Sequence, residues 1–304
     1  MKTIATRYCW FFWLIVSVAG RAETVAGYLA LGDSVPFGMN VTLLPPYSQQ
    51  PPTPSEFSGY PDVVAATEHM SQINASCPGE TSGSFLNVSV MDNGCNDPHI
   101  VPPAVSDLMP VIIPPFKTTY GLHTSYTGAQ MDFANLQLKS NKNIKLVTLS
   151  IGANDVLLIL PQLEACGSNG TCAQKALSDA LETYATNLEL ILTTIRSEYQ
   201  GALVLMTYYS PDPSLNSVTQ ALNSTMTQVA AQLSAQPGFA AIRIADGYTA
   251  FQLGSVFTNH NACQAGLLIK LPPSPYDLLP CDVHPSPIGR DLLAATVDLA
   301  LLVH

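Results

Sequence analysis

The sequence has few charged residues and no cluster of basic ones. Only 11% of its 304 residues are Asp, Glu, Lys or Arg, and 22 acidic residues outnumber 12 basic ones. Proteins that bind nucleic acids need a concentrated positive surface to neutralise phosphates. The formal net charge of −10 therefore excludes nucleic acid as an expected partner, and it also disfavours tight electrostatic binding to an anionic membrane.

Long hydrophobic runs are scarce as well. The one marked run, residues 9–19, follows Lys2 and Arg7 and is followed by small residues, as in an export signal. It falls short of the roughly 20 residues that a membrane-spanning helix needs, although an uncleaved N-terminal anchor is the alternative. We therefore predict that residues 1–22 are a signal peptide, that residues 23–304 form the secreted (extracellular or periplasmic) protein, and that this protein makes no stable membrane insertion.

The number of cysteines fits an exported protein. Of seven cysteines, Cys9 leaves with the predicted signal peptide, and an even number remains. An even number in an exported chain predicts disulfides, for which several pairings are possible. We expect sequential pairing because each couple brackets an expected loop: Cys77 with Cys95, Cys166 with Cys172, and Cys263 with Cys281. A zinc cluster is the alternative, but no Cys-x2-Cys pair with matching histidines is present.

The mature chain, of about 280 residues, fits one α/β domain, because no Gly/Ser-rich linker or charge run divides it. Strand-like and helix-like segments alternate along it, which predicts a parallel sheet covered by helices on both faces. A proline-rich stretch over about residues 80–127 predicts a long loop-rich insertion. The expected strands are residues 25–31, 72–77, 144–151, 202–208 and 239–244, and the expected helices are residues 60–70, 128–139, 172–199, 217–234 and 286–302.

A serine follows the first expected strand. Gly32, Asp33 and Ser34 form a glycine-containing turn between this strand and an expected helix. A hydroxyl at the carboxyl end of a parallel strand faces the crevice where open α/β sheets bind ligands, and the amides of a helix N-terminus favour an anion. Ser34 is therefore a candidate nucleophile, with ordinary turn chemistry as the alternative.

A nucleophilic serine needs a base and donors for the oxyanion that forms on attack. His284 precedes the last expected helix, and Asp282, two residues earlier, is placed to accept its Nδ1 proton. Asn154 follows the expected strand at 144–151, and Gly79 follows the one at 72–77, so both are candidate oxyanion donors. The alternatives are a solvated loop histidine, an asparagine that bonds its own backbone, and a plain glycine turn.

These four segments, in this order, resemble the SGNH or GDSL-type hydrolases. The residues that carry the resemblance are the nucleophile block at 32–34, the glycine block at 74–79, the asparagine block at 150–155 and the acid and histidine block at 282–285. The resemblance spans roughly residues 26–300. It implies a flavodoxin-like three-layer α/β/α sandwich around a central, mostly parallel five-stranded sheet.

The resemblance also implies a carboxylic ester hydrolase that requires no metal and no organic cofactor. Its catalytic residues would be Ser34 as nucleophile and His284 as base, and its oxyanion donors would be Ser34, Gly79 and Asn154. The expected substrate is a small-molecule, lipid or acylated-carbohydrate ester, and the expected state is a monomer. Two alternatives are a polysaccharide O-acetyl esterase and a catalytically inactive secreted binding protein on the same fold.

The sequence departs from the family pattern at the acid. The usual spacing is Asp-x-x-His, but Cys281 stands three residues before His284, and Asp282 comes one place late. Either Asp282 reaches the ring from its shifted position, or a main-chain carbonyl near Cys281 orients it.

The insertion adds two further open points. Gly128 is a second candidate for the glycine donor, although Gly79 is preferred for its Asn-x-x-x-x-Gly context and its distance of 45 residues from Ser34. The apolar residues of the insertion form a lid or an acyl-binding wall, or else simple loop packing; they are Phe116, Tyr120, Leu122 and Tyr126.

Overall fold

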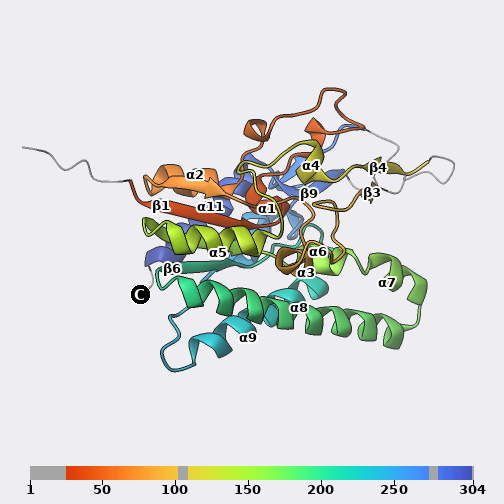
Figure 1. Ribbon diagram of the computed structural model, residues 1–304. Coiled ribbons are helices and arrows are strands. Elements are labelled where there is room, and N and C mark those ends of the chain that lie inside the picture. The colour runs from red at the N-terminus through yellow and green to blue at the C-terminus, as the bar shows by residue number, and fades with distance from the viewer. Residues whose placement is uncertain (1–24, 102–108, 274–279, 303–304) are drawn as a thin grey trace, which may run out of the picture.

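Five parallel strands form the central sheet of the computed structural model, which describes residues 25–101, 109–273 and 280–302 (Figure 1). Their order is β2-β1-β5-β6-β7, which is the 2-1-3-4-5 order of flavodoxin-like folds when only the sheet strands are numbered. The predicted fold class is confirmed, and the sheet is wholly parallel. The strands are β1 (Gly27–Gly32), β2 (Ser71–Asn74), β5 (Ile144–Ser150), β6 (Ala202–Met206) and β7 (Arg243–Ala245).

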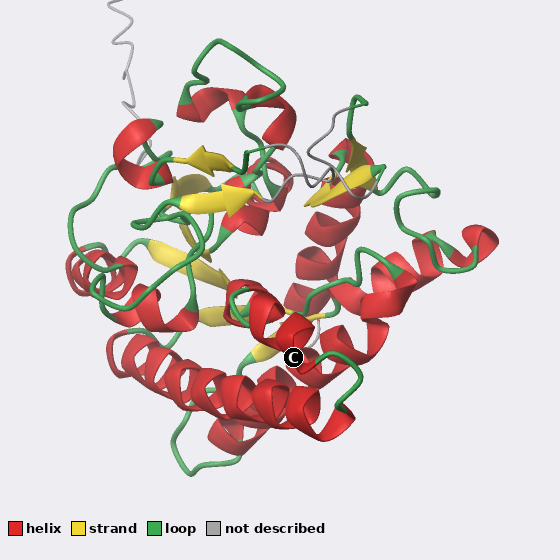
Figure 2. Cartoon of the chain, turned by 90° about the vertical axis from the view of Figure 1, so that its right-hand side faces the viewer, coloured by secondary structure: helices red, strands yellow, loops and turns green. Residues whose placement is uncertain are grey.

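Helices cover both faces of this sheet (Figure 1; Figure 2). One layer holds α2 (Tyr60–Thr67) and α11 (Pro287–Leu302), with α10 (Gly247–Gly254) packed on α11. The other layer holds α5 (Gln130–Ser140), α8 (Gly170–Glu198) and α9 (Asn216–Ser234). Because both faces are covered, every residue of β1 is buried, which explains why this strand is a continuous apolar run in the sequence.

The predicted strands and helices all form, with shifted ends. The largest difference is at β7, which begins at Arg243 rather than at residue 239, because Phe239 still belongs to the turn that follows α9 and donates its N–H to the Gln236 carbonyl. Additional short helices were not predicted. Outside the insertion they are α6 (Ala153–Leu157), α7 (Leu160–Cys166) and α10, and the single 3-10 turns at Val41–Leu43, Pro54–Glu56, Pro213–Leu215 and Val256–Thr258.

Short elements occupy the predicted insertion. They are α3 (Ser82–Leu86), the antiparallel pair β3 (His99–Val101) and β4 (Val111–Ile113), and α4 (Phe116–Thr119). Phe116 of α4 packs with Phe37 and Phe57 in a second apolar cluster. A further antiparallel pair, β8 (Leu268–Lys270) and β9 (Cys281–Pro285), lies outside the main sheet.

The six cysteines form the three disulfides in the expected sequential pairing: Cys77–Cys95, Cys166–Cys172 and Cys263–Cys281. Since Cys77 and Cys95 are bonded to each other, they offer no thiolate to a metal beside Glu80. The predicted signal peptide lies outside the described residues. Among the helices that the structure describes, none has the length and apolar character needed to cross a membrane.

Candidate active site

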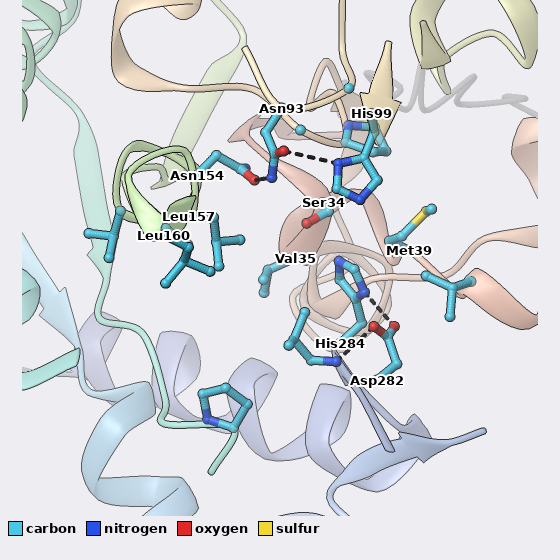
Figure 3. A pocket seen from close by; sticks show the side chains of 18 of the residues that line it. Ser34, Val35, Met39, Asn93, His99, Asn154, Leu157, Leu160, Asp282 and His284 are labelled. Atoms are coloured by element: carbon cyan, nitrogen blue, oxygen red, sulfur yellow. Dashed lines mark hydrogen bonds and ion pairs between the residues drawn. The ribbon is translucent and has the colours of Figure 1, made fainter. Parts of the chain in front are cut away.

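A cavity of about 430 Å³ opens at the carboxyl ends of β1 and β5. These neighbouring strands flank the point where the chain switches direction across the sheet, which is where open α/β folds bind ligands. The cavity brings together the residues predicted from four separate segments: Ser34, Gly79, Asn154, Asp282 and His284. Figure 3 shows all of them except Gly79 as labelled side chains.

Ser34 is the first residue of the short helix α1 (Ser34–Phe37), directly after β1. The turn requires glycine at position 32, because φ is +129° there and a Cβ would lie 1.9 Å from the Ser150 carbonyl oxygen. Asp33 caps the helix by accepting a 3.0 Å hydrogen bond from the Val35 N–H. Strand, glycine and cap together deliver the Ser34 side chain to the cavity.

Asp282 and His284 face the same side of β9. His284 was expected on a loop, but pairing with β8 and the disulfide at Cys281 make this segment extended. Side chains two residues apart on a strand point to the same face, so the Asp-x-His spacing suits a strand. His284 Nδ1 donates to Asp282 Oδ2 over 2.5 Å, and each side chain is only 12% exposed.

The electrostatic setting of His284 favours a proton on the ring. Burial lowers the pKa of His284, but the Asp282 carboxylate and its hydrogen bond, together with Asp33, more than offset this, so the pKa lies above its ordinary value. Among the described residues, no hydrogen bond joins the Ser34 hydroxyl to the His284 ring. Such contacts commonly tighten only when substrate binds.

Asn154 sits in the first turn of α6 (Ala153–Leu157), immediately after β5, and is 4% exposed. Its Nδ2 donates to the Glu80 main-chain carbonyl over 2.9 Å, and its Oδ1 accepts from Asn93 Nδ2 over 3.0 Å. These two contacts fix the orientation of the amide. One N–H of Nδ2 remains for a ligand in the cavity.

Gly79 lines the cavity, and Gly128 is not among the lining residues. Gly79 has a φ of +86°, and a Cβ there would lie 2.4 Å from the Asn93 carbonyl oxygen, so no other residue fits without displacing the backbone. The carbonyl of Gly128 instead accepts a hydrogen bond from Lys117. The geometry therefore favours Gly79 as the glycine donor.

The segment around Gly128 nevertheless reaches the nucleophile turn, through a residue that was not predicted. Gln130 accepts from the Gly32 N–H over 2.6 Å and donates to the Gly32 carbonyl over 2.9 Å. The same Nε2 lies 3.1 Å from a carboxylate oxygen of Glu80, whose pKa burial raises to about 7. No motif in the sequence indicated this contact between Gln130 and Glu80.

A second buried carboxyl lies beside the nucleophile. Burial raises the pKa of Asp33 to about 6, although the hydroxyl of Tyr208, at the end of β6, donates to it and opposes the shift. Asp33 is wholly buried and stabilises the turn that it was expected to form with Gly32 and Ser34.

The rest of the cavity lining is largely apolar. Of the four apolar residues singled out in the insertion, Phe116 lines the cavity, whereas Tyr120, Leu122 and Tyr126 pack in the second apolar cluster. The sequence did not indicate the leucines of α6 and α7, Leu157, Leu160 and Leu163, which also line it.

Comparisons with known proteins agree with this architecture. A family model described as GDSL-like Lipase/Acylhydrolase matches residues 28–297. Phospholipase A1 from Streptomyces albidoflavus is 17% identical, with 91% of this chain and 100% of that chain covered and a TM-score of 0.50. The extracellular lipase from Streptomyces rimosus is also 17% identical, with 90% and 99% covered and a TM-score of 0.51.

At such low identity the two structures show a shared fold alone, and no curated protein matches the chain. The family match is decisive because it extends over most of the sequence. The chain belongs to the GDSL-like lipase/acylhydrolase family and is a carboxylic ester hydrolase.

Proposed function

We propose that the protein is a secreted serine esterase of the lipase type, which cleaves carboxylic esters through an acyl-enzyme on Ser34. The observation that carries the proposal is the 2.5 Å contact between Asp282 Oδ2 and His284 Nδ1 in the cavity that also holds Ser34. A carboxylate at Nδ1 leaves Nε2 unprotonated in the neutral ring, which is the tautomer that a general base requires.

In the first half-reaction, His284 Nε2 takes the Ser34 proton while Oγ bonds to the ester carbonyl carbon. The oxyanion is met by the main-chain N–H groups of Ser34 and Gly79 and by the remaining N–H of Asn154. As the intermediate collapses, the bond between carbon and the alcohol oxygen breaks, and His284 returns its proton to the leaving alcohol. Water then attacks the acyl-enzyme in the same way and releases the acid and free Ser34.

The cavity supports an apolar acyl group. A volume of about 430 Å³ with a largely apolar lining exceeds what an acetyl group fills. Burial of each acyl CH₂ contributes about 0.8 kcal/mol, so longer chains should bind better until the cavity is full. This favours a lipase-type or general esterase over a polysaccharide O-acetyl esterase.

Secretion is supported by the three disulfides, which persist in oxidising compartments, and by the export-like features of residues 1–22. We propose that the secreted enzyme works as a monomer, since every residue of the proposed site comes from one chain.

Labelling with a fluorophosphonate, followed by a chain-length series of p-nitrophenyl esters, tests the proposal. The wild type and a Ser197→Ala control, altered at an exposed serine on α8, should be labelled and active, whereas Ser34→Ala should be neither. Full activity of Ser34→Ala would overturn the proposed nucleophile. A folded wild type that is neither labelled nor active would instead support an inactive binding protein.

A further inference from the structure

A second histidine lines the cavity, and the proposed mechanism does not use it. His99 lies on β3, paired with Ile113 of β4, and both residues border the cavity. In the view of Figure 3, Ser34 lies between His99 and His284. Because His99 lines the same cavity as Ser34, it can contact a substrate bound there.

A chain of hydrogen bonds determines which ring nitrogen of His99 carries a proton. The Glu80 carbonyl can only accept, so Asn154 presents its Nδ2 there and its Oδ1 to Asn93. Asn93 therefore donates through Nδ2, and its Oδ1 accepts from His99 Nδ1 over 3.0 Å. The proton of the neutral ring is on Nδ1, and His99 Nε2 is a bare acceptor.

The neutral form is the one that the site favours. Burial lowers the pKa of His99, the nearby His284 lowers it further, and Asp282 opposes both. Within the described ranges, Nε2 has no protein partner. Because His99 borders the cavity, this acceptor can take a hydrogen bond from a ligand bound there.

The position of His99 indicates which part of a substrate would donate. Leu157 and Leu160 lie on the Asn154 side of Ser34, away from His99 (Figure 3). An acyl chain packed on these leucines leaves the alcohol portion on the His99 side. Two hydroxyl donors can reach that side: a free hydroxyl of the alcohol portion, or the water that hydrolyses the acyl-enzyme.

We propose that His99 selects esters of polyhydric alcohols, such as partial glycerides, by accepting a hydrogen bond at Nε2 from a hydroxyl next to the scissile ester. The proposal rests on the proposed function, since it places a substrate over Ser34. It gives His99 the role of a specificity residue that contacts the alcohol portion.

The test compares 2-hydroxyethyl butanoate with propyl butanoate, which has a methyl group in place of the hydroxyl. The readout is the kcat/KM for 2-hydroxyethyl butanoate divided by the kcat/KM for propyl butanoate, measured in the wild type, His99→Asn and His99→Gln. Asn keeps a donor for Asn93 but has no group at the Nε2 position, so the ratio should fall about 3- to 10-fold. Gln reaches that position with its Oε1 and should retain most of the ratio, and His260→Asn, at an exposed histidine, serves as the control.

The ratio separates the outcomes. Both esters form the same acyl-enzyme, so slower attack by water lowers kcat without changing the ratio. The two leaving groups differ in the same way for every variant, so this difference cancels when variants are compared. An unchanged ratio in His99→Asn would therefore overturn the proposal, including the case in which both esters slow equally. If the wild type hydrolyses neither ester and Ser34 is not labelled, the proposed function itself fails.

Discussion

Replacing Asp282 by Asn removes one charge from the His284 ring and changes little else in shape. The two groups lie 2.5 Å apart and are largely shielded from water, so the contact is a strong charge-assisted hydrogen bond. An amide at this position donates to Nδ1 and forces the proton onto Nε2. That tautomer cannot accept the Ser34 proton.

The expected loss is large. Where an aspartate fixes the tautomer of a catalytic histidine, Asn costs about 10⁴-fold in kcat, or roughly 5 kcal/mol at 1.36 kcal/mol per tenfold change. If a main-chain carbonyl near Cys281 oriented the ring instead, the Asp282→Asn variant should lose less than about tenfold. The two possibilities thus differ by about three orders of magnitude.

The pH profile gives a second, independent readout. Activity requires neutral His284, so kcat/KM rises with pH through the pKa of that ring. Asp282 raises this pKa, so its removal should move the acidic limb to lower pH while the plateau falls. The measurement is p-nitrophenyl butanoate hydrolysis from pH 5 to 9, with the exposed Asp291→Asn as control. A plateau within tenfold of wild type and an unmoved limb would refute the assigned role.

Three further substitutions test the surroundings of Ser34. Asn154→Ala should lower kcat about 10²- to 10³-fold with little change in KM, since it removes one oxyanion donor; an equal loss through KM would contradict this. Gly79→Ala should lower both the melting temperature and kcat/KM, because its Cβ would lie 2.4 Å from the Asn93 carbonyl oxygen; a variant as stable and active as wild type would exclude Gly79 from the tight turn. Glu80→Gln should stabilise the protein at pH 8 but not at pH 4. The folded-state pKa of Glu80, about 7, exceeds its ordinary 4.5. The unfolding free energy of the wild type therefore falls by at most about 3 kcal/mol as the pH rises from 4.5 to 7, and thermal melts at several pH values would measure this.

The main sheet could be predicted because each strand carries its own recognisable pattern of apolar residues. A strand buried on both faces is a nearly continuous apolar run. β1 is such a run, and β5 is buried at every position except Lys145. Ser34 and Asn154 follow these two strands in the sequence. The weaker β7 lies at the edge of the sheet and has three residues, so the apolar pattern placed it four residues too early.

The insertion could not be predicted to the same degree, because its elements depend on distant partners. β3 and β4 are separated in the sequence and come together only by pairing with each other. The disulfide Cys77–Cys95 fixes the turn beside Asn93. Asn93 and His99 carry no periodicity or motif. In the fold, Asn93 is held by its hydrogen bond to Asn154, and His99 by its hydrogen bond to Asn93.

The acid position was left open by the sequence for a related reason. Asp282 and His284 share a face only if the segment is extended, and nothing within it requires that. β9 forms because it pairs with β8 and because Cys263 holds Cys281. Tyr209 then donates to the Val283 carbonyl over 2.7 Å and secures the strand between the two catalytic candidates.

The three segments that carry the proposed oxyanion donors are joined by hydrogen bonds through Gln130 and Glu80. Gln130 holds both polar groups of Gly32, and the same glutamine meets Glu80, whose carbonyl orients Asn154. Nucleophile turn, glycine block and asparagine block are therefore linked before a substrate arrives. Preorganised donors of this kind pay no reorganisation energy when the oxyanion forms, which is the source of their catalytic effect. In the proposed mechanism, neutral N–H dipoles would therefore stabilise the oxyanion, and Asp282 beside His284 would supply the charge that orients the base.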